Sequence, residues 1–179
     1  MTIRAFKRGS CREQTSLLPP RIEDYVDVTK TEFICGDLDS LKVIQTYPAF
    51  DFPEHEGLNV YSIDEIATKK IVALTAPKRS QPRDLIDIWT LLEDHDLELS
   101  MLALPIAQKL KFRNRPADGL SEAFDKKEKL LKVTWNTRLD PQMPKTPEFE
   151  GVYRAVRQSF RNANLFETTS VELIRLNGS

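Results

Sequence analysis

The sequence predicts an α+β fold in which a small antiparallel β element is followed by a helical portion. Alternating β-branched and aromatic residues are confined to the part of the 179-residue chain before residue 62. From residue 62 onward, apolar residues recur at helical spacing. The 40% of hydrophobic residues and the 30% of charged residues are typical of a globular protein, and a chain of this length can bury its own core. The net charge of −1 favours neither nucleic acid nor an acidic partner. We therefore expect a β region over 1–61, a helical region over 62–166 and a tail over 167–179.

The β region divides into a polar, irregular stretch and a predicted hairpin. Residues 1–24 are basic and broken by Pro19-Pro20. The segment that follows predicts strands over 26–35 and 41–47, separated by the turn-type cluster "CGDLDS". A further short strand is expected at "VYS", residues 60–62.

Two adjacent helices follow the hairpin. The first is predicted over 62–77, since Ser62 and Glu65 form a capping-box pattern and Pro77 marks the end. The second is predicted to have Ser80 as N-cap and Pro82 in its first turn. Its apolar residues fall at i, i+3, i+4 and i+7, which is the strongest helical pattern in the chain; they are Leu85, Ile88, Trp89 and Leu92.

Further helices are predicted in the second half. One lies within the segment 99–112. It is expected to begin close to Pro105, because proline is best tolerated in a first turn. Another covers 118–135 with Asp118 as its cap. A proline-rich linker leads to a last helix with Thr146 as cap and Pro147 at its first position. The tail after residue 166 is expected to fray.

Several classes of site are excluded by composition. The two cysteines, Cys11 and Cys35, form no Cys-x-x-Cys pattern, so neither a disulfide framework nor a zinc site is expected. His55 and His95 have no metal-ligand spacing and are expected to be exposed. No apolar run approaches 18 residues and no secretory signal is present, so we expect no membrane span and a cytoplasmic protein.

The candidate site combines charged groups of the two adjacent helices. Lys69 and Lys70 lie on the first, and Arg83, Asp84 and Asp87 lie on the second. A short connector predicts an antiparallel pair, which brings Lys70 near Asp84 or Asp87. A lysine held by a carboxylate is a suitable phosphate-binding device, because the ammonium binds the anion while the carboxylate fixes its position.

A purely structural interpretation of the same charges is also open. Acidic residues in a first helical turn stabilise the helix by about 0.3–1 kcal/mol, because they interact favourably with its dipole. Arg83 and Asp87 are spaced as an i,i+4 ion pair worth about 0.2–0.5 kcal/mol. Spacing alone does not decide between these interpretations.

The segment "YSIDEIATKKIVALTAPKRSQPRDLIDIWTLLE" resembles the AbiEii-type nucleotidyltransferase toxin family, and "GDLDSLKVIQTYPAF" resembles the segment that precedes it in part of that family. The resemblance covers about residues 35–95. The matching residues are Ser62, Ile63, Glu65, Ile66, Ala67, Lys70, Ala73, Leu74, Arg83, Asp84, Asp87, Leu91 and Leu92.

The resemblance implies a nucleotidyltransferase core followed by helices, in a type IV toxin–antitoxin or phage-defence system. It implies transfer of a nucleotide from an NTP to an RNA acceptor, tRNA in some branches, with Mg²⁺ as cofactor and an antitoxin as partner. It places Lys70 and Asp84 in the active site, with Asp87 as the alternative to Asp84. Lys70 and Arg83 are the residues that it implies for nucleotide binding.

The family pattern also contains a Gly-Ser turn followed by Asp-x-Asp, which binds the metal. Here no Asp-x-Asp follows Gly9-Ser10 at the required distance, and no carboxylate stands near Ile44, where a third is expected. The nearby acidic residues have the wrong spacing or belong to a predicted turn; they are Glu23, Asp24, Asp27, Asp37 and Asp39. We therefore expect a truncated or diverged member that lacks most of the N-terminal catalytic half. A non-catalytic helical module that binds a partner protein or RNA is the alternative.

One further basic run is ambiguous. Lys109, Lys111, Arg113 and Arg115 lie beside Phe112 and indicate either contact with RNA phosphates or a solvated helix end. Trp89 and Trp135 are expected in the core rather than stacked on bases.

Overall fold

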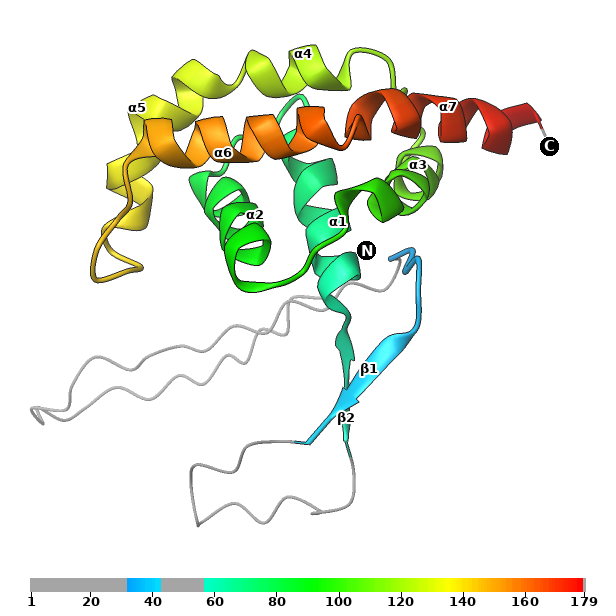
Figure 1. Cartoon of the computed structure of the whole chain (residues 1–179), viewed down its shortest axis with the longest axis horizontal. Coiled ribbons are helices and arrows are strands. Elements are labelled where there is room, and N and C mark those ends of the chain that lie inside the picture. Colours follow the sequence, from blue (N-terminus) through cyan, green and yellow to red (C-terminus); the bar gives the residue numbers. More distant parts are fainter. Residues whose placement is uncertain (1–31, 43–56, 179) are drawn as a thin grey trace, which may run out of the picture. The chain divides into compact units, whose positions relative to one another are not determined.

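The computed structural model describes residues 32–42 and 57–178. The chain divides into two units, Met1–Phe33 and Ile34–Ser179, and the elements described below belong to the second. In order they are β1 (Leu38–Leu41), β2 (Leu58–Tyr61), α1 (Ile63–Leu74), α2 (Pro82–Asp94), the 3₁₀ turn η1 (Leu99–Leu102), α3 (Ala103–Phe112), α4 (Leu120–Asp125), α5 (Glu128–Leu139), α6 (Phe149–Asn162) and α7 (Leu165–Gly178) (Figure 1). The predicted α+β class, a small antiparallel sheet followed by helices, is confirmed.

The hairpin pairs different segments from those predicted. β1 and β2 are antiparallel, with Leu38 opposite Tyr61 and Leu41 opposite Leu58. β1 lies in the cluster predicted as a turn, because the bend is completed earlier, at Gly36, and ladder partners decide strand position more than local propensity does. Of the strand predicted over 26–35, residues 32–35 are described and are not a strand. Of the strand predicted over 41–47, residues 41 and 42 are described, and the first of these ends β1. Residues 26–31 and 43–47 lie outside the described residues. The short strand predicted at 60–62 corresponds to β2.

The start of α1 follows only half of the predicted capping box. The Ser62 hydroxyl accepts a hydrogen bond from the Glu65 backbone N–H at 3.2 Å. The Glu65 side chain does not return to the cap, because it is buried against Lys109. α1 then ends at Leu74, before Pro77, as predicted.

The cap predicted for α2 is wrong by one residue, since Gln81 rather than Ser80 precedes the helix and Pro82 is its first residue. The predicted apolar stripe faces the core: Leu85 and Ile88 are fully buried, and Trp89 and Leu92 are half-buried. α1 and α2 pack against each other, as the short connector between them requires.

Three predictions for the later helices need correction. The single helix expected over 118–135 is divided into α4 and α5, and its N-cap is Gly119, whose φ of 70° is the left-handed conformation that glycine favours, rather than Asp118. The last predicted cap, Thr146, instead donates to Asp140 at 2.7 Å, and Glu148 precedes α6. The tail expected to fray forms α7, in which Thr169 is fully buried.

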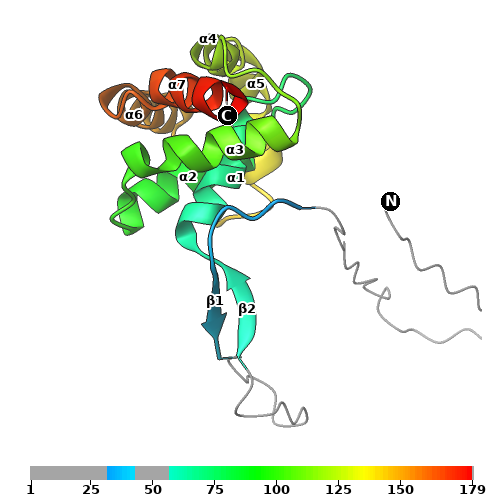
Figure 2. The ribbon, with the colours of Figure 1, turned by 90° about the vertical axis from the view of Figure 1, so that its right-hand side faces the viewer.

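The helices share one core. α7 packs along α3, and α6 packs on α2 and α5 (Figures 1 and 2). Aromatic rings join α4, α6 and α7, since Phe124 stacks on Tyr153 at 5.0 Å and meets Phe160 edge-on at 5.5 Å. Trp135 is buried, as predicted, and donates its indole N–H to the Pro147 carbonyl at 2.8 Å. Among the described helices, none has the length and apolarity needed to cross a bilayer.

A buried ion pair links α1 to α3. The Lys109 Nζ lies 2.5 Å from the Glu65 Oε1, and both side chains are 2% exposed. The other carboxylate oxygen accepts the Cys35 backbone N–H at 3.2 Å, and the Cys35 thiol donates to the Pro105 carbonyl at 3.3 Å. Burial raises the pKa of this thiol. The pair therefore attaches the segment before β1 to both helices.

This arrangement changes the interpretation of the basic run. Lys109 is buried, Lys111 donates to the Leu176 carbonyl, and Arg115 binds the end of α1. Lys111 and Arg113 are exposed, which is consistent with a solvated helix end, whereas Lys109 and Arg115 are bound within the fold.

We predict that Lys109→Met lowers the free energy of unfolding by about 3–5 kcal/mol, because it leaves the Glu65 carboxylate buried without a cation. The double variant Glu65→Gln/Lys109→Met should recover most of this loss, since it removes the charge and keeps an acceptor for Cys35. Urea denaturation measures both. The exposed pair of Lys132 and Glu150 supplies the control, and Lys132→Ala should leave stability unchanged. A Lys109→Met protein as stable as wild type would contradict the prediction.

Candidate functional site

The strongest cluster of charges lies between α1 and α2. The Lys70 amine forms ion pairs with Asp84, at 3.4 Å, and with Asp87. The Asp84 side chain is 1% exposed, whereas Lys70 and Asp87 are 27% and 41% exposed. The sequence predicts that Lys70 lies near Asp84 or Asp87, and in the structure it contacts both. Neighbouring Lys69 is directed elsewhere, with its amine 4.0 Å from the centre of the Tyr61 ring.

Asp84 is the buried centre of the cluster. Its Oδ2 accepts from the Arg79 Nε at 2.8 Å, and its Oδ1 accepts from the Arg79 Nη2 at 3.1 Å as well as from Lys70. This two-point contact with a guanidinium is the strong form of a charge-assisted hydrogen bond. It also raises the pKa of Arg79. A buried carboxylate requires such compensation, so Arg79 and Lys70 together allow Asp84 to be charged inside the fold.

The sequence pattern did not identify Arg79, which lies in the short connector between the two helices. Its position five residues before Asp84, in a connector too short to extend away, is the signal that could have found it. Arg83, in contrast, is exposed. The predicted Arg83–Asp87 pair is not formed, because Asp87 is directed towards Lys70 on α1.

Two cations from later in the chain hold the connector between α1 and α2. Arg115 donates to the carbonyls of Val72 and Thr75, each at 2.9 Å, and so satisfies the C-terminal end of α1. The Lys127 amine donates to the carbonyls of Ala76 and Arg79. Burial lowers the pKa of Arg115, and burial together with the nearby charge of Arg115 lowers the pKa of Lys127 to about 8.

The described residues contain no cluster of metal ligands. Within residues 32–42 and 57–178, no group of three or more His, Cys, Asp or Glu side chains could hold a metal ion. Both oxygens of Asp84 are already occupied by cations. Asp37 precedes β1 and Asp39 lies on it, and both are exposed.

Of the two histidines, His95 is the one that lies among the described residues. His95 is exposed, as predicted. The groups that lie outside the described residues are Gly9, Ser10, Cys11, Glu23, Asp24, Asp27, Ile44 and His55.

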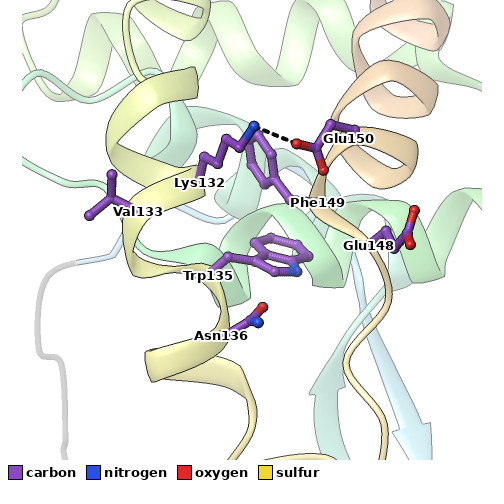
Figure 3. Close-up of a pocket in the computed structure, with 7 residues that line it drawn as sticks. All are labelled: Lys132, Val133, Trp135, Asn136, Glu148, Phe149 and Glu150. Carbon is purple, nitrogen blue, oxygen red and sulfur yellow. Dashed lines mark ion pairs between the residues drawn. The ribbon is translucent and has the colours of Figure 1, made fainter.

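A separate pocket of about 470 Å³ lies between α5 and the start of α6 (Figure 3). It is lined by Lys132, Val133, Trp135, Asn136, Glu148, Phe149 and Glu150. The Lys132 Nζ lies 2.5 Å from the Glu150 Oε1 and forms an ion pair with it. The indole N–H of Trp135 donates to the Pro147 carbonyl. The Lys132 and Glu150 side chains are 60% and 55% exposed, whereas the Lys70–Asp84 cluster is built around a buried carboxylate. The cluster is therefore the better candidate.

One comparison with known proteins gives a match. The model of a family described as "Nucleotidyl transferase AbiEii toxin, Type IV TA system" matches residues 18–163, which is most of the chain and includes the whole cluster. Neither the curated proteins nor the solved structures gave a significant match.

We predict different stability effects for the two carboxylates. Asp84→Ala should lower the free energy of unfolding by about 1.5–3 kcal/mol, because it removes charge-assisted bonds from a buried position. Asp87→Ala should change it by less than about 1 kcal/mol, since that pair is partly exposed. Equal effects in urea denaturation would contradict the burial of Asp84, and a neutral Asp87→Ala makes that variant a clean probe of function.

We also predict a pH dependence of stability from Lys127. Its folded-state pKa of about 8 lies below the ordinary lysine pKa of 10.5, so between these pH values the unfolded chain binds more protons. The contribution of Lys127 to stability should therefore rise as pH increases from about 8 to 10.5 and be constant below this window. Comparison of the melting temperatures of wild type and Lys127→Met across pH 7–10 measures it. The melting temperature of wild type minus that of Lys127→Met should increase over pH 8–10. A decrease in this difference would refute the prediction.

Proposed function

Because the chain belongs to the AbiEii family of nucleotidyl transferase toxins of type IV toxin–antitoxin systems, we propose that it transfers a nucleotide from an NTP to an RNA acceptor such as tRNA. The observation that carries the proposal is the Lys70 amine, which is held between the buried Asp84 and the exposed Asp87. Such a lysine is a cation of fixed position at the protein surface.

The proposed reaction is displacement at phosphorus. A hydroxyl of the acceptor forms a bond to the α-phosphorus, the bond from this phosphorus to the pyrophosphate oxygen breaks, and the hydroxyl proton passes to solvent. In this scheme Lys70 binds phosphate oxygens and offsets their charge, which is the main contribution that protein groups make to phosphoryl transfer. No step is assigned to a metal, because the described residues contain no cluster of three or more metal-ligating side chains.

The other residues have supporting roles in the proposal. Asp84 and Arg79 fix the side of α2 that faces Lys70. Asp87 is the accessible carboxylate, so it marks the side from which the substrate reaches Lys70. Arg83 is exposed one residue before Asp84 and supplies positive charge for the approach of a triphosphate. The proposed setting is the cytoplasm, with an antitoxin as partner and phage defence as the biological role.

A non-catalytic interaction module is the second candidate. Three leucines of the hairpin, Leu38, Leu41 and Leu58, are 41–59% exposed, and they favour a protein partner over RNA. Pull-down of a stable partner whose binding is unaffected by Lys70→Ala and Asp84→Asn, together with no nucleotide transfer, would favour this function.

We predict that the purified chain transfers label from one of the four NTPs to tRNA in a Mg²⁺-containing buffer. Lys70→Ala should lower the rate by at least about 100-fold, because the phosphate oxygens lose the positive charge that binds them. Asp87→Ala, which is expected to be stable, tests the accessible carboxylate. Lys129→Ala removes an exposed lysine of α5 and should be without effect. No transfer from any NTP, or full activity of Lys70→Ala, would refute the proposed function.

A further inference from the structure

The contacts around the α1–α2 connector assign a role to Lys127, a residue far from Lys70 in the sequence. We propose that Lys127 is a positioning residue of the Lys70–Asp84 site, which acts by holding the connector that presents Arg79 to Asp84. The proposal rests on the proposed function for the meaning of the site, and on the geometry for the coupling.

The position of Lys127 is enforced by the fold. It stands between α4 and α5 and is the residue that precedes α5. Helical periodicity of the sequence predicts no break at this point, and the break turns a lysine inward until only 7% of it is exposed. A buried lysine is unfavourable unless its amine is bonded. The compensation comes from two carbonyls of the connector, those of Ala76 and Arg79.

The contact reaches the site in two steps. Lys127 binds the backbone carbonyl of Arg79, and the guanidinium of that same residue holds both oxygens of Asp84. Asp84 in turn contacts the Lys70 amine. Displacement of the Arg79 backbone would therefore change the position of Asp84, and through it the position of Lys70.

A direct role in binding substrate is less consistent with the structure. The Lys127 amine is directed at the connector and is buried, whereas Lys70 and Arg79 are partly exposed. Arg115 has a different task, since it binds Val72 and Thr75 at the end of α1 and does not contact Arg79. Lys127 is thus the cation that connects the α4–α5 segment to the site.

The coupling does not depend on the charge of Lys127. The charged groups that act on it are Arg115 and Arg79, which disfavour its ammonium form, and Asp84, which favours it. A neutral amine retains two N–H groups, which is enough for the two carbonyls. The hold on the connector is therefore expected on both sides of the titration.

The test uses the full chain with Lys127→Met, which keeps an apolar stem and removes the donors. Lys126→Met is the matched control, since Lys126 is adjacent and exposed. Hydrogen exchange followed by mass spectrometry should show the peptide over 75–84 exchanging at least about tenfold faster in Lys127→Met, while α6 and α7 are unchanged. Lys126→Met should match wild type throughout. Unchanged exchange of the connector, or a uniform increase over the whole chain, would overturn the proposal.

Kinetics separate positioning from general stability. In Lys127→Met, kcat should fall about tenfold while KM for the NTP changes by less than about threefold, because misplacement of Lys70 weakens the transition state more than the ground state. In an Arg79→Ala background, Lys127→Met should have little further effect on kcat, since both changes break the same path. Fully additive effects on kcat would overturn the proposal.

Two safeguards keep the outcomes distinct. If Lys127→Met does not fold, Lys127→Gln replaces it, since its amide keeps two N–H groups on a shorter side chain. Exchange of the 75–84 peptide should then rise by less than in the donor-free variant and only in that peptide, and unchanged or uniformly faster exchange would overturn the proposal. If wild type transfers no nucleotide, the proposed function fails, and the exchange experiment still decides whether Lys127 holds the connector.

Discussion

The need to compensate a buried carboxylate organises this protein. Asp84 lies in the first turn of α2 with a side chain that is 1% exposed, and a charge in that position is tolerated only with opposite charges beside it. Lys70 must therefore reach across from α1, and the connector must fold so that Arg79 returns to α2. The short loop between the two helices is fixed by this electrostatic requirement as much as by its length. The carbonyls of this loop accept hydrogen bonds from Arg115 and Lys127. These bonds connect the segment after α3 and the α4–α5 segment to the loop.

The same principle operates a second time, in the pair of Glu65 and Lys109. Here both charges are buried, and the carboxylate also accepts a backbone N–H from the segment before β1. Removing one partner of a buried pair leaves a charge without compensation, which is strongly destabilising. In this chain the Glu65 pair connects α1 to α3, and the Asp84 pair connects α1 to α2. The apolar core is shared by the same helices.

The sequence predicted the parts of the fold that depend on near neighbours. The periodicity of α1 and α2 and the short connector between them were sufficient to bring Lys70 to Asp84 and Asp87. The sequence failed where a distant partner decides. β1 occupies a turn-like cluster because residues 58–61 supply its ladder, and the helix after residue 118 breaks because Lys127 binds a connector 48 residues earlier. Lys109 belongs to a run for which the sequence indicates RNA contact or a solvated helix end. It is buried instead, because it pairs with Glu65, which lies 44 residues away in the sequence. No local pattern contains that information. Arg79 was the exception, since its partner was near and the connector length could have indicated it.

The packing of α3 against α7 has a consequence for the order in which the molecule forms. Residues 113–164 separate these two helices, so their contact closes a long loop, and contacts of this kind are made late because the chain loses entropy before it gains the contact. During synthesis, α1, α2 and α3 leave the ribosome well before α7, with the surface that α7 later covers still open to solvent. Ile106 and Leu110 of α3 are almost completely buried in the finished protein. The interval before α7 arrives is therefore the period in which the nascent chain is most exposed to aggregation and to chaperones.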